Sequence, residues 1–137
     1  MLDKNLTYYL TGPMSGIPRC NIPLFDSATA ALREAGYKII SPGELDSPAV
    51  RAEGLASAEG FITSESWGSL LGRDVKIVAD HVDGLILLPG WQRSRGARLE
   101  VFVGLLCIKD FGLYDPATEA PIPADRDRIR RWFKDSL

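Results

Sequence analysis

The strongest constraint on the fold is a continuous apolar run at residues 84–88, Gly-Leu-Ile-Leu-Leu. A run with no polar alternation is typical of a central strand buried on both faces, as in a parallel sheet covered by helices. A polar, arginine-rich segment follows at 91–100 and ends at Glu100. Ligands of open α/β sheets bind outside the carboxyl ends of the strands. Glu100, about one turn into the next predicted helix, is therefore a candidate nucleophile or general base.

The remaining apolar patterns predict further strands and helices that alternate along the chain. We expect strands at 6–10, 37–40 and 111–114, and helices at 24–35, 66–81, 97–108 and 125–133. Gly36 is expected to end the first helix as its C-cap. Residues 44–62 are expected to form a long loop with room for one helical turn, and residues 116–123 a second loop.

Alternation of this kind implies a parallel sheet with helices on both faces. We therefore predict a single α/β domain over residues 1–137, with a Rossmann-like (flavodoxin-like) three-layer fold and a mostly parallel sheet of about four to five strands.

Composition excludes several classes of function. The net charge of −2 gives no bias toward a nucleic acid polymer, and no apolar run approaches the length of a membrane span. The N-terminal residues lack the pattern of a signal peptide, and neither cysteine has a metal-type or redox-type spacing, so a reducing cytoplasm is expected. His81 is the only histidine, which disfavours a histidine metal cage and a Ser-His-Asp triad. We expect neither a cofactor nor a metal.

Two loops carry the residues suited to a polar ligand. The segment from Gly12 to Gly16 offers backbone amides that can cradle an anion, although it fits neither common phosphate-loop pattern and a plain tight turn is the alternative. In the second loop, Arg93, Arg95 and Arg98 carry guanidinium groups suited to a phosphate, and Ser94 and Gly96 lie at a predicted helix N-terminus. The alternative for the arginines is solvated surface charge, and for Glu100 it is an exposed residue that complements the helix dipole.

Asp74 is the second candidate acid. It lies on the apolar face of the helix predicted at 66–81, and its nearest lysine, Lys76, is off that face. An acid there is usually paired, capped or functional, because an unpaired buried charge is costly. On the helix predicted at 97–108, the inward side is expected to carry Leu99, Val103, Leu106 and Cys107.

These segments resemble a known superfamily. The motifs are Tyr9-Leu10-Thr11-Gly12-Pro13-Met14-Ser15-Gly16, Gly72-Arg73-Asp74, the strand at 84–88 and Ser94-Arg95-Gly96-Ala97-Arg98-Leu99-Glu100. In order and spacing they are similar to those of the nucleoside 2-deoxyribosyltransferase superfamily, and more closely to its small, often phage-encoded branch DUF4406. The resemblance covers most of residues 5–115.

The resemblance implies cleavage of the N-glycosidic bond of a nucleoside or a nucleoside 5′-monophosphate. It implies that Glu100 attacks C1′, that Asp74 protonates or orients the base, and that Tyr9 lies near the sugar and Glu100. The implied substrate-binding residues are Gly12, Pro13, Met14, Ser15, Gly16, Arg19, Trp91, Arg93, Ser94, Arg95 and Gly96. Pro13 stands where many members have a small polar residue, and Ser15 or Arg19 can replace that phosphate contact. Met14, Ile17, Phe25 and Trp67 are the expected walls for the base.

The arginines around Glu100 favour a nucleotide with a phosphate over a free nucleoside. Hydrolysis is therefore expected ahead of base exchange, and the resemblance further implies a homodimer or higher homo-oligomer. Two other functions stay open: a non-catalytic sensor of a nucleotide or NAD-like molecule in the same cleft, and a structural or interaction protein.

Overall fold

A computed structural model describes residues 2–136 of the chain. One five-stranded sheet has the order β2-β1-β3-β4-β5. The strands are β1 (Thr7–Thr11), β2 (Lys38–Ile40), β3 (Gly84–Leu87), β4 (Asp110–Asp115) and β5 (Ala120–Ala124). The pairs β1–β2, β1–β3 and β3–β4 are parallel, and only β4–β5 is antiparallel. The predicted Rossmann-like α/β fold with a mostly parallel sheet is confirmed.

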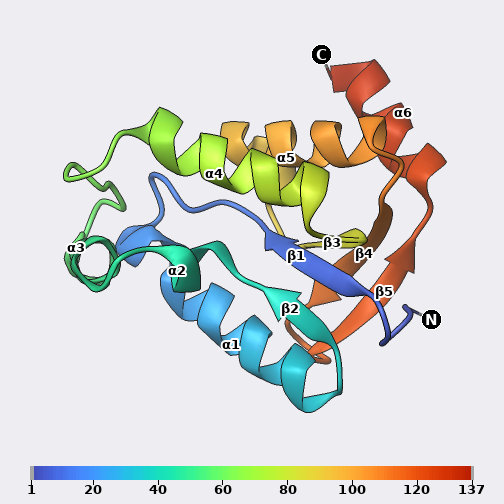
Figure 1. Cartoon of the computed structure of the whole chain (residues 1–137), viewed down its shortest axis with the longest axis horizontal. Helices are drawn as coiled ribbons and strands as arrows, with labels where there is room; N and C mark the ends of the chain where they lie inside the picture. Colours follow the sequence, from blue (N-terminus) through green and yellow to red (C-terminus); the bar gives the residue numbers. More distant parts are fainter. Residues whose placement is uncertain (1, 137) are drawn as a thin grey trace.

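Helices cover both faces of this sheet (Figure 1), which gives three layers. The longer helices are α1 (Ile22–Glu34), α4 (Trp67–Asp80), α5 (Arg95–Leu106) and α6 (Arg126–Ser136). The short ones are η1 (Pro18–Asn21), α2 (Pro42–Leu45), α3 (Pro48–Ala56) and η2 (Trp91–Arg93). None of the described helices combines the length and the apolar character needed to cross a bilayer.

Alternation along the strands divides the core into two clusters. Tyr8, Leu10 and Ile86 pack with Phe25 and Leu32 of α1. On the other face, Tyr9, Leu85 and Leu87 pack with Val78 of α4 and Val101 of α5. All four residues of β3 are buried, as the unbroken apolar run predicts.

The long loop predicted at 44–62 is wrong, because part of it forms helix α3. Pro48 looks like a helix breaker but occupies the first turn, where a missing N–H costs nothing. The Ser47 hydroxyl caps this turn by accepting a hydrogen bond from the Val50 amide at 3.2 Å.

The loop predicted at 116–123 is also wrong, because its second half belongs to β5. Pro121 and Pro123 argue against a central strand, but β5 is at the edge of the sheet, where proline is tolerated.

The inward face predicted for α5 is wrong at three of its four residues, and only Val103 packs partly buried against the core. Leu99 and Leu106 are 39% and 67% exposed, and Cys107 is exposed. The buried residues are Ala97, Glu100, Val101, Gly104 and Leu105. Small residues allow α5 to approach the sheet closely, since a Cβ on Gly104 would lie 2.7 Å from Leu85 Cδ1. The side of α5 that faces the protein therefore carries a carboxylate and two small residues beside Val101 and Leu105.

Candidate active site

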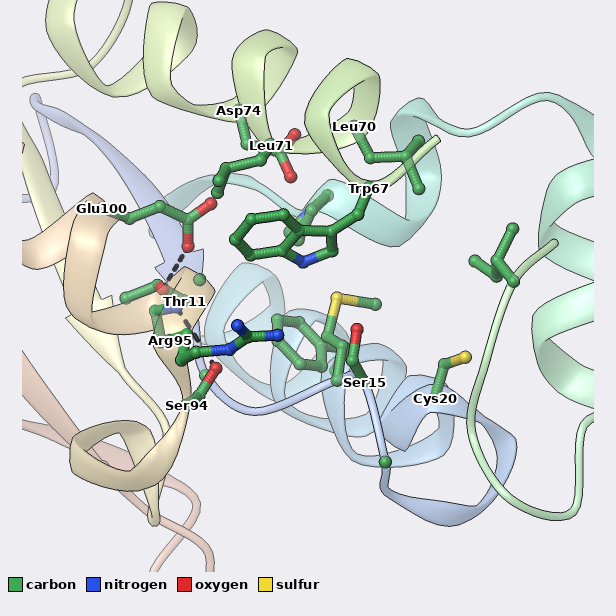
Figure 2. Close-up of a pocket in the computed structure, with 18 of the residues that line it drawn as sticks. Thr11, Ser15, Cys20, Trp67, Leu70, Leu71, Asp74, Ser94, Arg95 and Glu100 are labelled. Atoms are coloured by element: carbon green, nitrogen blue, oxygen red, sulfur yellow. Dashed lines mark hydrogen bonds between the residues drawn. The ribbon is translucent and has the colours of Figure 1, made fainter. Parts of the chain in front are cut away.

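A cavity of about 470 Å³ lies at the carboxyl ends of β1 and β3. This volume falls within the range of about 300–1,000 Å³ that is usual for small-molecule sites. Its walls come from the end of β1 and the loop after it, the start of α4, the start of α5 and two segments near residues 42–46 and 61–65. Figure 2 shows Glu100 of α5 and Asp74 of α4 on neighbouring sides of this space, with Trp67 and Arg95 also pointing into it.

Glu100 is held by two hydroxyl groups from β1. The Tyr9 hydroxyl donates to Glu100 Oε2 at 2.8 Å, and Thr11 Oγ1 donates to Oε1 at 2.6 Å. Tyr9 and Thr11 are two residues apart on a strand, so both face α5. Glu100 itself is only 6% exposed. The alternative of an exposed glutamate that only complements the helix dipole is therefore wrong.

The environment of Glu100 favours its uncharged form. Burial raises its pKa to about 8, with a further contribution from the negative charge of Asp74. The hydrogen bonds from Thr11 and Tyr9 act in the opposite direction and stabilise the carboxylate. The same burial, with the nearby carboxylates, raises the pKa of the Tyr9 hydroxyl well above its ordinary value. A carboxyl group with such a raised pKa, in a cavity, is typical of functional sites.

Asp74 lines the same cavity, but it does have a local cation. Arg73 Nε donates to Asp74 Oδ1 at 2.9 Å, so the partner of this acid is the adjacent arginine, which the position of Lys76 did not indicate. Adjacent helix residues do not normally face each other, and Arg73 reaches Asp74 because its other nitrogens are held by Asp46 and the Pro42 carbonyl. Burial raises the pKa of Asp74, and the guanidinium of Arg73 partly offsets this effect.

The start of α5 supplies the cationic part of the cavity. Arg93, Ser94, Arg95 and Gly96 line it. The Ser94 hydroxyl caps α5 by accepting from the Ala97 amide at 3.2 Å, and the Arg95 guanidinium lies 5.3 Å from the centre of the Trp67 ring. Arg98 does not line the cavity, because its guanidinium packs against Trp132 of α6 at 5.6 Å.

The loop after β1 contributes Gly12, Met14, Ser15 and Gly16 to the lining. Gly12 is required by packing, since a Cβ there would lie 2.7 Å from Leu88 Cβ.

Three expected binding residues lie outside the cavity lining. The Pro13 carbonyl accepts from Asn21 Nδ2 at 2.8 Å, and Arg19 Nε donates to the Leu55 carbonyl at 3.1 Å. Trp91 is buried in the core, where its ring lies 5.2 Å from that of Trp132. Of the expected walls for the base, Met14, Phe25 and Trp67 do line the cavity, whereas Ile17 does not.

A family model described as "Domain of unknown function (DUF4406)" matches residues 6–110. The chain belongs to the DUF4406 family. The matched segment contains every residue that lines the cavity, whereas β5 and α6 lie beyond it. A search of curated proteins found no match.

Several cavity residues of this DUF4406 chain were missed by sequence reasoning. Thr11 was predictable, because it shares a strand face with Tyr9. Asp46 and Arg73 were not, since their meeting depends on α2, which is too short for a periodic pattern. The segment 57–64 forms a further wall with Phe61 and Ile62, and Glu53 anchors it through hydrogen bonds from Thr63 and Ser64.

Among the described residues, no cluster of three or more histidine, cysteine, aspartate or glutamate side chains is arranged to hold a metal ion.

Proposed function

We propose that this protein hydrolyses the N-glycosidic bond of a nucleoside or deoxynucleoside 5′-monophosphate. The observation that carries the proposal is the position of Glu100, a buried carboxyl group held by Tyr9 and Thr11 in a cavity that Arg95 and Ser94 also line. The motif resemblance to the nucleoside 2-deoxyribosyltransferase superfamily supports the same reaction.

The proposed chemistry uses Glu100 as the nucleophile. Cleavage at an anomeric carbon passes through an oxocarbenium-like state, which an adjacent carboxylate stabilises and then captures. A bond forms between a Glu100 oxygen and C1′, and the electrons of the C1′–N bond leave with the base, which takes a proton. Asp74 faces the same cavity and orients or protonates that base. Water then cleaves the glycosyl ester and restores Glu100.

The phosphate is assigned to the beginning of α5. A helix N-terminus favours anions, and Arg93 and Arg95 are exposed side chains at the rim with nitrogens free for a phosphate. Ser94 and Glu100 are six residues apart, a rise of about 9 Å along the helix axis. A sugar 5-phosphate can bridge this span with C1′ near Glu100 and the phosphate near Ser94.

The test is release of free base from a panel of ribonucleoside and deoxyribonucleoside 5′-monophosphates and the matching nucleosides, followed by chromatography. We expect base from at least one monophosphate, faster than from its nucleoside, and none with Glu100→Gln. Glu44→Gln is the control, because Glu44 is a 43% exposed side chain paired with Arg33 outside the cavity. If no monophosphate releases base, the proposal is wrong.

The same panel separates the other two functions of the site. Base exchange differs only in the acceptor, so a second free base added to the reaction would then appear in a new nucleotide. A sensor would bind a nucleotide or NAD-like molecule in calorimetry and return it intact after long incubation.

Assembly into a homodimer is part of this proposal. On α5, the apolar residues Leu99, Phe102 and Leu106 are 39%, 40% and 67% exposed. Their spacing places them on one side of the helix, a surface that a second copy can cover. Light scattering after size-exclusion chromatography gives the mass in solution, and a monomer would refute this part alone.

A further inference from the structure

Arg73 connects three parts of the molecule at the cavity. Its Nε donates to Asp74 Oδ1 at 2.9 Å, its Nη1 to Asp46 Oδ1 at 2.7 Å and its Nη2 to the Pro42 carbonyl at 3.3 Å. All three guanidinium nitrogens are therefore engaged, which fixes the plane of the group. The side chain of Asp46 is only 5% exposed, so this bridge is largely shielded from water.

Arg73 contacts only one of the two acids in the cavity. Arg73 is in direct contact with Asp74, whereas the hydrogen-bond donors to Glu100 are the neutral hydroxyls of Tyr9 and Thr11. Two carboxylates that share a cavity repel each other, so the pair retains one proton more readily than two separate acids would. The acid in contact with the guanidinium is the one that loses its proton first.

We propose that Arg73 is a positioning residue that holds Asp74 ionised and oriented toward the cavity, so that the proton shared by the two acids rests on Glu100 in the free protein. The groups that face Asp74 are Arg73 on its own helix, Tyr9 on β1, Glu100 on α5 and Asp46 after α2. Of these, only Arg73 is cationic. Burial and the charge of Asp74 also raise the pKa of Glu100, in agreement with this distribution.

The consequence for catalysis rests on the proposed function. The proton must leave Glu100 before the carboxylate attacks C1′, and the departing base needs one proton. Asp74 lines the same cavity as Glu100, so it can take up the proton as Glu100 ionises and pass a proton to the base nitrogen. The net transfer is one proton from Glu100 to the base.

Carboxyl titration followed by ¹³C NMR tests the positioning role without any substrate. Protein labelled at Asp and Glu carboxyl carbons is titrated, and the two resonances are assigned with Asp74→Asn and Glu100→Gln. In the wild type, Asp74 is expected to titrate at lower pH than Glu100. Arg73→Met is expected to raise the Asp74 midpoint by about one pH unit or more, the usual effect of losing an adjacent opposite charge.

Arg51→Met is the matched control. The Arg51 side chain is 30% exposed against 29% for Arg73, and it also binds an aspartate, Asp26, and an α2 carbonyl, that of Gly43. It lies outside the cavity lining, so its loss removes comparable anchoring of α2 and should leave both carboxyl midpoints unchanged. An Asp74 midpoint that Arg73→Met does not move, or that Arg51→Met moves equally, overturns the proposal.

If Arg73→Met does not fold, Arg73→Gln decides. Glutamine keeps a hydrogen-bond donor but carries no charge, so the Asp74 midpoint should still rise, and an unchanged midpoint again overturns the proposal. The kinetic measurement is separate: in an active protein, Arg73→Met should shift the pH profile of kcat/KM and Arg51→Met should not. A protein that releases no base would refute the proposed function and leave the titration result standing.

Discussion

Replacing Glu100 by glutamine should stabilise the protein, and the gain should grow with pH. The folded state raises the pKa of Glu100 from 4.5 to about 8, because burial disfavours the charged form. The contribution of this group to stability is therefore fully present below about pH 4.5 and is lost as pH rises through about 8. Glutamine does not ionise and is free of this loss. It can still accept a hydrogen bond from Thr11 and donate one to the Tyr9 oxygen.

The size of the effect follows from the two pKa values. The difference between about 8 and 4.5, multiplied by about 1.4 kcal/mol for each pH unit, sets an upper limit of about 5 kcal/mol. A domain of this kind is stable by about 5–15 kcal/mol, so even half of this limit is easily measured. The free energy of unfolding of Glu100→Gln minus that of the wild type should rise between pH 5 and 8 and level off above.

Urea unfolding at pH 5, 6, 7, 8 and 9 measures this difference for Glu100→Gln and for the control Glu44→Gln. Glu44 is exposed, so its difference from the wild type should change little over this range. A Glu100→Gln difference that stays flat from pH 5 to 9 would show that the folded protein does not hold Glu100 protonated. Base release by Glu100→Gln should be slower by at least about 10³-fold, the effect of losing a nucleophile. If this variant is also more stable than the wild type, Glu100 is a residue kept for function at a cost in stability.

Three further predictions concern the same site. The kcat/KM for base release should fall as pH rises through about 8, because the proton held by Glu100 in the free protein is the one passed to the base; a profile that keeps rising above pH 8 would contradict this. Asp74→Asn should slow base release by about 10²-fold or more while preserving the fold and phosphate binding. It should also move the alkaline fall of the profile to lower pH, because the charge of Asp74 helps to raise the pKa of Glu100; wild-type turnover would remove Asp74 from the mechanism. Gly12→Ala should destabilise the protein by about 1–3 kcal/mol in urea unfolding, because its Cβ would meet Leu88. The control Gly68→Ala should be neutral or stabilising, because Gly68 is in helix α4 and its Cβ would have no atom within 4 Å. Equal effects of the two substitutions would refute the packing argument.

The sheet and the contact between Glu100 and Tyr9 could be predicted from local sequence patterns. An unbroken apolar run predicts β3, and parallel pairing places the ends of β1 and β3 at one edge. Residues that follow those ends must then converge, which is why Gly12, Ser94 and Glu100 line one cavity. These inferences need only strand order and side-chain alternation.

The bridge between Asp46 and Arg73 needs tertiary information. Its formation depends on a short helix, α2, which begins with proline and is too brief for a periodic pattern. The same limit applies to α3 and to the wall at 57–64, where Gly60 adopts a φ of +82° and its amide donates a hydrogen bond to the Ser57 hydroxyl oxygen at 3.0 Å. Side-chain hydrogen bonds of this kind determine the path of the chain, and no apolar pattern reports them.

The error on α5 is the most informative, because it has the same cause as the site itself. A helix that packs on a sheet normally presents large apolar residues inward, and on that basis Leu99 and Leu106 were expected to be buried. The fold buries Glu100 instead and leaves both leucines exposed. Burying an ionisable group costs free energy, and here β1 supplies two hydroxyls that reduce the cost without removing it. A reactive carboxyl group requires a helix face of this kind, which is not wholly apolar and meets polar partners on the facing strand. The departure from the apolar pattern therefore supports the role proposed for Glu100, because violations of local packing rules are expected at functional sites.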